Sequence, residues 1–294
     1  MALANSPFLA SADIARHHYN QPPIPRIERR PPLSVSRALA AVSGLAFIPL
    51  IFAAPVSAEV ADINYVALGD SFSSGLGTAD YDDDGCKRGP AAYPELWAAS
   101  NAPAAFDFVA CSGATTDDVL NDQVSALSPE TNLVTITIGG NDVGFADVIT
   151  TCRLGSNADC DEVGEQAENE VRDVLPGLLD QTYGAITEAA PQAQVVVLGY
   201  PSLFELGPCG VGSIGEVKRE RLNQMADVLS DTIADRATSA GLTHVDVNGT
   251  FEGHRVCADE PWINGTKVPI SESYHPNASG HSEGYLPAMA GAIG

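Results

Sequence analysis

The chain has 294 residues, 45% of them hydrophobic, so it is long and apolar enough to bury a sizeable core. This composition excludes an intrinsically disordered chain and a collagen-like repeat. Lys and Arg number 15 against 38 Asp and Glu, and the net charge of −23 argues against a protein that binds nucleic acid phosphates.

The N-terminal region is typical of a secretory signal. Residues 1–37 are polar and Pro-rich and contain five Arg, and residues 38–54 form an apolar run. Small residues at 56–58 then meet the requirement of signal peptidase. We expect residues 1–58 to be a leader cleaved after Ala58 and residues 59–294 to be a secreted domain. A membrane anchor is the alternative, against which a glycine and a proline within the run argue.

Cleavage would make the net charge of the protein more negative. Residues 1–58 hold five basic and two acidic residues, so the remainder keeps 10 basic and 36 acidic residues, a net charge of −26. Such a surface keeps an exported protein soluble and repels anionic polymers and anionic lipid headgroups at low salt. We expect no nucleic acid partner, at most transient contact with a membrane surface, and a monomer.

Short β-rich apolar runs alternate with helical patterns after the leader, which predicts a parallel sheet with helices on both faces, a three-layer α/β/α sandwich. The expected strands are 63–68, 106–110, 133–138, 195–198 and 244–247, and the expected helices are 93–100, 116–121, 161–188, 214–240 and 277–292. Pro176 and Gly177 should kink or split the third helix, and Asn277 is placed to cap the fifth. Ligands bind outside the carboxyl ends of such strands, so the residues that follow each strand are the candidates for a site.

The first expected strand is followed by Gly69, Asp70 and Ser71. The glycine permits a tight turn, which would place Ser71 at the sheet edge and at the start of a helix. A serine hydroxyl in that place can act as a nucleophile. The alternative is a serine that caps the helix and has no chemistry.

An acidic segment, residues 80–85, follows the first turn and contains four Asp. Carboxylates are preferred calcium ligands, but the segment lacks the distal Glu of an EF-hand loop. We therefore interpret it as a solvated loop and expect neither a metal nor a cofactor.

The second and third strands are followed by further hydrogen-bond donors. Gly113 lies after the second strand and Asn141 after the third. With the N–H of Ser71, the N–H of Gly113 and the amide of Asn141 would form a three-donor oxyanion hole. The alternatives are a turn glycine and a helix cap.

Six cysteines lie in the exported part, which makes disulfides the expectation, although six cysteines allow 15 pairings. Cys152 and Cys160 enclose a short polar loop and form the first pair we expect. Sequential pairing then gives Cys86 with Cys111 and Cys209 with Cys257. A zinc site is the alternative, but the spacing of zinc motifs does not occur in the sequence.

A base for Ser71 is available near the C-terminus. His275 is followed by Pro276, which stiffens the turn, and neutral imidazole can accept a serine proton at neutral pH. Glu272, three residues earlier, could orient the ring, but a backbone carbonyl of the loop could do the same. The rival bases, which we expect to be structural, are His244, His254 and His281.

Together these motifs resemble the SGNH hydrolases, also called GDSL esterases and lipases, and in particular secreted actinobacterial members with three disulfides. The resemblance spans residues 69–281. Ser71 in Gly-Asp-Ser-Phe matches the first block, Gly113 the second, Asn141 in Gly-Gly-Asn-Asp the third and His275 the last. The family usually has Asp three residues before the His, where this chain has Glu272, and in related secreted enzymes a main-chain oxygen takes the role of that Asp.

The resemblance implies a flavodoxin-like sheet of five parallel strands and hydrolysis of carboxylic esters without a cofactor. Ser71 would form an acyl-enzyme with His275 as the base. The substrate would be a lipid or short-chain acyl ester; alternatives are an acetyl ester of a carbohydrate and, on the same fold, a non-catalytic glycan-binding module. Residues 200–214, with Leu203, Phe204 and Leu206, are the candidate wall of an acyl pocket, and core packing is their alternative role.

Overall fold

The computed structural model describes residues 62–210 and 214–293. The leader and cleavage site expected within residues 1–58 lie outside this part of the chain. Five parallel strands form one sheet in the order β2-β1-β3-β4-β5, so the expected α/β fold with a five-stranded parallel sheet is confirmed. The strands are β1 (Asn64–Ala67), β2 (Ala105–Phe108), β3 (Leu133–Ile136), β4 (Gln194–Leu198) and β5 (Thr243–Val245).

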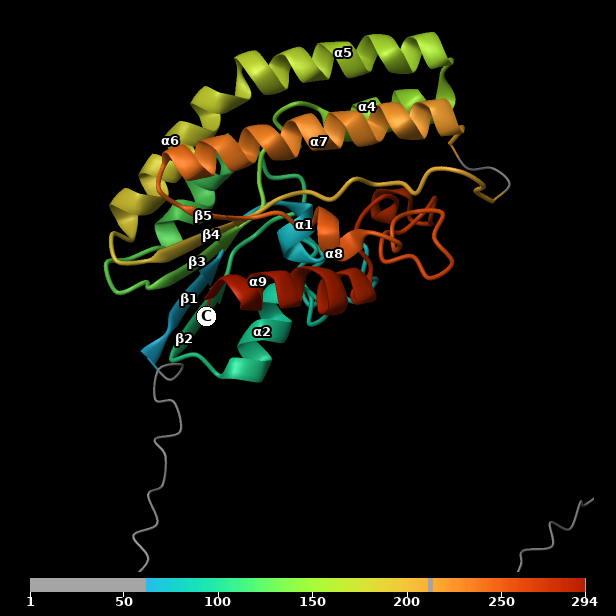
Figure 1. Cartoon of the computed structure of the whole chain (residues 1–294). Coiled ribbons are helices and arrows are strands. Elements are labelled where there is room, and N and C mark those ends of the chain that lie inside the picture. Colours follow the sequence, from blue (N-terminus) through green and yellow to red (C-terminus); the bar gives the residue numbers. More distant parts are fainter. Residues whose placement is uncertain (1–61, 211–213, 294) are drawn as a thin grey trace, which may run out of the picture. The chain divides into compact units, whose positions relative to one another are not determined.

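Helices cover both faces of the sheet (Figure 1). The α-helices are α1 (Ser71–Ser74), α2 (Tyr93–Asn101), α3 (Thr116–Asp118), α4 (Phe145–Leu154), α5 (Asn157–Asp173), α6 (Leu175–Ala189), α7 (Glu216–Ser239), α8 (Asn248–Phe251) and α9 (Leu286–Ile293). The other helical turns are η2 (Val119–Gln123), η3 (Val124–Ala126), η4 (Ile270–Glu272) and η5 (Gly280–Tyr285). One layer contains α4 to α7 and the other contains α2 and α9. Within the described residues, no helix is both long and apolar enough to cross a membrane.

The central strands are buried as their sequences predict. All four residues of β3 are buried, and so are the four apolar residues that end β4. Burial on both sides explains why these strands read as continuous apolar runs rather than alternating ones. The strands end at the carboxyl edge of the sheet, where the loops that follow β1, β2 and β3 begin.

The helix expected over 161–188 is two helices. It splits at Val174, immediately before the first turn of α6, which contains Pro176. The first helix starts earlier than expected, because Ser156 accepts a hydrogen bond from the N–H of Asp159 and the Asp159 carboxylate accepts from the N–H of Ser156. This capping box supplies both terminal donors with partners.

Helix α4 was not predicted from the sequence. It begins after Gly144, which has φ of 64° and makes no side-chain cap, so the usual polar signal for a helix start is missing. The segment Arg153–Asp159 was expected to be a loop between two cysteines. In fact Cys152 lies in α4 and Cys160 in α5, and a two-residue connection joins the helices.

The final helix also differs from the expectation of one α-helix over 277–292. The side chain of Asn277 accepts from the N–H of Gly280 at 3.1 Å, but wide π-helical turns, η5, precede α9. A Cβ at Gly284 would lie 2.5 Å from the ring of Phe251, so a glycine permits this close approach. The described residues contain three disulfides, Cys86–Cys111, Cys152–Cys160 and Cys209–Cys257, the sequential pairs.

Candidate active site

The turn after β1 holds Ser71 at the carboxyl edge of the sheet. Gly69 has φ of 124°, and a Cβ there would lie 2.5 Å from the Ser73 hydroxyl and 2.6 Å from the carbonyl oxygen of Thr137. Only glycine fits this turn. The carboxylate of Asp70 accepts from the N–H of Phe72 at 2.9 Å and caps α1, so Ser71 occupies the first position of a helix.

The side chains of Ser71 and His275 are in direct contact. Nε2 of His275 lies 2.9 Å from Oγ of Ser71, although the two residues are 204 positions apart. Nδ1 of His275 lies 3.0 Å from the carbonyl oxygen of Ser273. A carbonyl only accepts, so Nδ1 carries the ring proton and Nε2 is left free to accept the proton of the serine hydroxyl.

The ring of His275 is kept neutral by its surroundings. Burial lowers the pKa of His275 to about 4, against the opposing effects of the Ser273 carbonyl and the charge of Glu272. Phe72 packs against the ring, with centroids 5.2 Å apart. A neutral imidazole in contact with a hydroxyl is the arrangement that general-base catalysis requires.

Glu272 does not orient His275, so that part of the sequence prediction needs correction. Its carboxylate accepts from the hydroxyl of Tyr81 at 3.0 Å and pairs with Nζ of Lys267 at 3.1 Å. Tyr81 hydrogen-bonds one oxygen and Lys267 forms an ion pair with the other, while the carbonyl of Ser273, nearer in sequence, reaches Nδ1 of the ring. The alternative expected from the sequence, a backbone carbonyl, is therefore the one that the structure contains.

The other two expected donors lie on neighbouring loops. Gly113 has φ of 87°, and a Cβ added there would meet no atom within 4 Å, so its backbone is open to a ligand. The loop lies alongside the serine turn, because the N–H of Cys111 donates to the carbonyl of Gly69 at 2.9 Å. Within residues 62–210 and 214–293, no group accepts from the N–H of Ser71 or of Gly113. Both N–H groups are therefore available to a substrate.

Asn141 lines the same cavity as Ser71. Its Nδ2 donates to the carbonyl of Ala114 at 2.9 Å, which uses one of its two hydrogens and fixes the amide. The two donor loops are also tied directly, because the N–H and hydroxyl of Thr116 both donate to the carboxylate of Asp142. The second amide hydrogen of Asn141 remains for a ligand.

A buried network that the sequence analysis missed links the serine turn to the Asn141 loop. The hydroxyl of Tyr200 donates to Oδ2 of Asp70, and the N–H of Gly140 donates to Tyr200 at 3.1 Å. Burial raises the pKa of Asp70 to about 7, and the hydrogen bonds from Tyr200 and Phe72 oppose that rise. Tyr200 comes soon after β4 in the chain. Its position just beyond a strand, the same feature that identified the other site residues, could have marked it as a candidate.

A cavity of about 440 Å³ opens beside Ser71 and His275. Of the candidate wall at 200–214, Tyr200, Pro201 and Leu203 line this cavity, whereas Phe204 lines a second cavity and Leu206 is exposed. Two helices supply further apolar lining. From α4 come Phe145, Ala146, Ile149 and Leu154, and from α7 come Ala226 and Leu229.

Neither the rival histidines nor the acidic loop forms a hydrogen bond with the side chain of Ser71 or His275 among the described residues. His244 lies in β5, and His254 stacks on Trp262 with centroids 3.8 Å apart. His281 is fully buried, and burial lowers its pKa to about 3. In the acidic loop, the carboxylates of Asp83 and Asp84 pair with the neighbouring cations Arg88 and Lys87.

Comparison with known proteins identifies the family of the chain. Residues 67–282 match the model of the GDSL-like lipase/acylhydrolase family. The chain belongs to this family. It is a carboxylic ester hydrolase, as the family and its relatives indicate, and its substrate is a small-molecule or lipid ester.

Similar members of the GDSL-like family come from Streptomyces. Lipase 1 of Streptomyces coelicolor is 49% identical over 231 residues, which cover 78% of this chain and 86% of that protein. The crystal structure of an extracellular lipase from Streptomyces rimosus has 48% identity and a TM-score of 0.76, covering 78% of this chain and 99% of that one. The structure of phospholipase A1 from Streptomyces albidoflavus has 48% identity and a TM-score of 0.77, covering 79% and 100%.

Proposed function

We propose that this family member hydrolyses esters through an acyl-enzyme on Ser71, with His275 as general base and acid. The observation that carries the proposal is the 2.9 Å contact between Nε2 of His275 and Oγ of Ser71 at the wall of an apolar cavity. The Ser273 carbonyl fixes the ring tautomer from the other side. Serine and histidine thus act as a dyad, and Glu272 has no direct part in the chemistry.

The reaction proceeds in two halves. Oγ of Ser71 attacks the acyl carbon while His275 takes the hydroxyl proton, and the N–H groups of Ser71 and Gly113 and the amide of Asn141 bind the oxyanion. The bond to the alcohol breaks as His275 returns the proton to the leaving oxygen. Water then attacks the acyl-enzyme, again giving a proton to His275, and the acid leaves as Ser71 regains its hydrogen.

We propose a lipid ester with a medium or long acyl chain as the substrate. The cavity of about 440 Å³ is lined mainly by apolar side chains and is far larger than an acetyl group needs. The similar proteins are a lipase and a phospholipase A1, which supports the same class. An acetyl ester of a carbohydrate is the competing substrate, because the Ser71–His275 pair would serve either acyl group.

A chain-length series of nitrophenyl esters separates the two substrates. We expect kcat/KM to rise from the acetyl to the octanoyl ester. Ile149→Trp, which fills the cavity from α4, should lower kcat/KM for the octanoyl ester by about tenfold more than for the acetyl ester. If the wild type and Ile149→Trp both preferred the acetyl ester, the carbohydrate substrate would be favoured instead.

We further propose that the enzyme acts outside the cell as residues 59–294, after removal of the leader 1–58. The Streptomyces rimosus relative is an extracellular lipase, which supports export. Three disulfides within residues 86–257 suit an oxidising compartment. N-terminal sequencing of protein recovered from the culture medium should begin at or near Glu59, and a chain that retains the apolar run would contradict the proposal.

Replacement of the nucleophile is the direct test of the mechanism. Ser71→Ala should lower kcat on a soluble short-chain ester by at least about 10⁴-fold, and a fluorophosphonate should label the wild-type protein at Ser71. Ser74→Ala is the matched control, because its hydroxyl lies in the same short helix and contacts the Ser71 carbonyl oxygen at 3.4 Å. A Ser71→Ala protein with the wild-type rate would remove the proposed mechanism.

A further inference from the structure

Exposed hydrophobic side chains are concentrated around the mouth of the cavity. Six large hydrophobic residues are exposed in the part of the chain that the structure describes: Leu154, Val174, Leu206, Val217, Val268 and Ile270. Leu154 and Ile270 line the cavity beside Ser71, and Val268, which is 92% exposed, lies two residues before Ile270. We call Leu154, Val268 and Ile270 the apolar rim.

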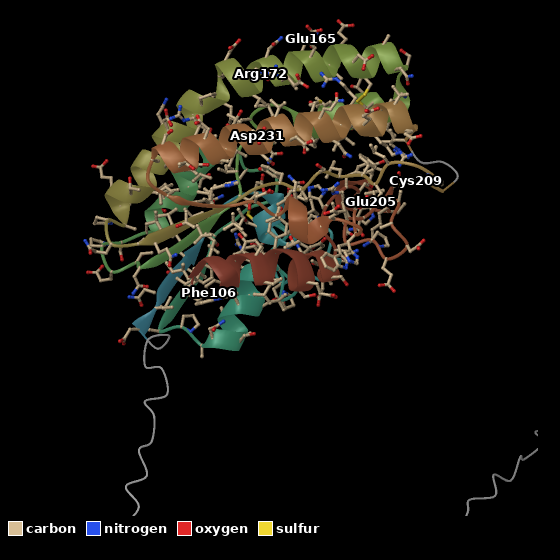
Figure 2. The ribbon with its side chains drawn as sticks, viewed as in Figure 1. Phe106, Glu165, Arg172, Glu205, Cys209 and Asp231 are labelled. Atoms are coloured by element: carbon tan, nitrogen blue, oxygen red, sulfur yellow. A yellow bond between two sulfur atoms is a disulfide. The ribbon has the colours of Figure 1, made fainter. Side chains whose placement is uncertain are left out.

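Two of the remaining exposed residues lie at the same end of the molecule. The ammonium group of Lys218 donates to the carbonyl of Gly155, which brings Val217 beside the end of α4 that carries Leu154. The N–H of Gly207 donates to Glu216, so Leu206 is also close to the start of α7. Figure 2 shows Glu205 and Cys209 at this end of the fold, away from Arg172, which lies close to Val174 in the chain.

One of the two cations at the rim is unpaired. Lys267 forms an ion pair with Glu272 at 3.1 Å, whereas segment 150–155 contains Arg153 and no Asp or Glu. Arg153 lines the cavity, is exposed and forms no salt bridge with another described residue. Its guanidinium can therefore pair with a phosphate outside the protein.

We propose that the apolar rim docks the enzyme on the surface of a phospholipid aggregate, with Arg153 at the level of the phosphates. This inference rests on the proposed lipid substrate and extends it to the physical state of that substrate. An acyl chain that moves from a lipid layer into the cavity must cross the mouth. Apolar side chains that enter the lipid layer would shield the acyl chain from water during this transfer.

The chemistry of the apolar rim indicates a lipid surface as its binding partner. Three exposed apolar side chains next to an unpaired cation match the acyl region and phosphates of a lipid surface. The net charge of −26 expected for residues 59–294 repels a second copy of the chain. Self-association through the rim is nevertheless an outcome that sedimentation without lipid detects.

The test uses Val268, which does not line the cavity, and Val174 as its matched control at the junction of α5 and α6. Vesicles of ether-linked phosphatidylcholine cannot be hydrolysed, so co-sedimentation with them measures binding alone. We expect Val268→Ser to weaken binding about five- to tenfold and Val174→Ser to leave it unchanged. Both variants should hydrolyse a soluble butyrate ester at the wild-type rate, which shows that they are folded.

Several outcomes would overturn the proposal. They are no binding of the wild-type protein to the vesicles, equal weakening by the two substitutions, and a Val268-dependent dimer in sedimentation without lipid. Ser71→Ala protein should bind the vesicles like wild type. If Ser71→Ala kept full activity but still bound the vesicles, the mechanism would be refuted and the docking surface would stand. The two proposals can therefore fail separately.

Discussion

The serine and the histidine that meet in the site are held by two very different regions. Ser71 follows a buried parallel strand, and its turn is determined by residues within a few positions, Gly69 and the capping carboxylate of Asp70. His275 lies at the end of an irregular segment, 252–277. The short turn η4 is the one helical element that the structure describes there.

Long-range contacts replace regular structure around the histidine. The backbone of Asn264 exchanges hydrogen bonds with Tyr274 and His275, and its side chain donates to the carbonyl of Gly77 at 2.8 Å. The Cys209–Cys257 disulfide closes the segment onto the loop after β4. The comparison teaches that one reactive group is placed by local sequence and the other by cross-links between distant parts of the chain.

Removal of the cross-link should give the largest effect. The Cys209–Cys257 bond closes a loop of 48 residues and the Cys152–Cys160 bond a loop of 8. Chain-entropy estimates predict losses of about 4 and about 2.5 kcal/mol in unfolding free energy on replacing each pair by Ser. Urea denaturation measures the unfolding free energy of each variant. A larger loss on removal of Cys152–Cys160 would contradict the conclusion that the histidine segment depends on its disulfide.

Asn141 tests the strand-end side of the site. Asn141→Ala removes one proposed oxyanion donor and should lower kcat by about 10²–10³-fold, because such a donor acts mainly in the transition state. KM should change little. Asn101→Ala, at the end of α2, is the control, and an equal loss from both variants would argue against a specific role for the Asn141 amide.

The pH profile tests the histidine side. Because the pKa of His275 is lowered to about 4, about nine-tenths of the rings are neutral at pH 5, whereas a pKa near 6.5 would leave about 3% neutral. The value of kcat/KM on a neutral soluble ester should therefore persist to about pH 5 and fall as the pH approaches 4. An acid limb near 6.5 that Tyr200→Phe leaves in place would show that the ring is more exposed to solvent than the structure indicates.

Tyr200 tests the link between the two donor loops. Tyr200→Phe leaves the N–H of Gly140 without its acceptor and Oδ2 of Asp70 without its donor, so kcat should fall about tenfold. It should also raise the pKa of Asp70 further, because the hydrogen bond that favours the carboxylate is lost. An acid limb near pH 7 that moves upward in the variant would belong to Asp70.

The control for this variant is Tyr183→Phe. Tyr183 is fully buried in α6, and its hydroxyl has no hydrogen-bond partner among the described residues. The substitution therefore removes the same atom without breaking a network. Equal effects of the two variants on kcat would show that Tyr200 acts through packing alone.

Glu272 should give the smallest effect on the chemistry. Glu272→Gln should change kcat less than about threefold below its melting temperature, because the Ser273 carbonyl orients the ring. Removal of an orienting carboxylate from a serine triad costs about 10⁴-fold. A loss of that size here would restore Glu272 to the role that the sequence suggested.

The sequence alone predicted the parts of the molecule that short-range patterns determine. Buried parallel strands read as apolar runs, so the sheet was predictable, and so was the serine turn, because Gly69 lies directly after the strand. The structure shows that Asp70, rather than Ser71, caps the helix. Helix α4 was missed because a glycine replaces the polar cap at its start. The part of the cavity wall that α4 supplies was missed with it.

Only the tertiary structure decided which oxygen faces the histidine ring, which side chains line the cavity and where exposed apolar residues gather. Glu272 was three positions from His275 and chemically suitable, yet Tyr81 and Lys267 engage its carboxylate. Sequence spacing limits what two groups can reach, but competing partners from other loops determine which contact forms. Local geometry is encoded over a few residues, whereas these choices depend on segments up to 204 residues apart.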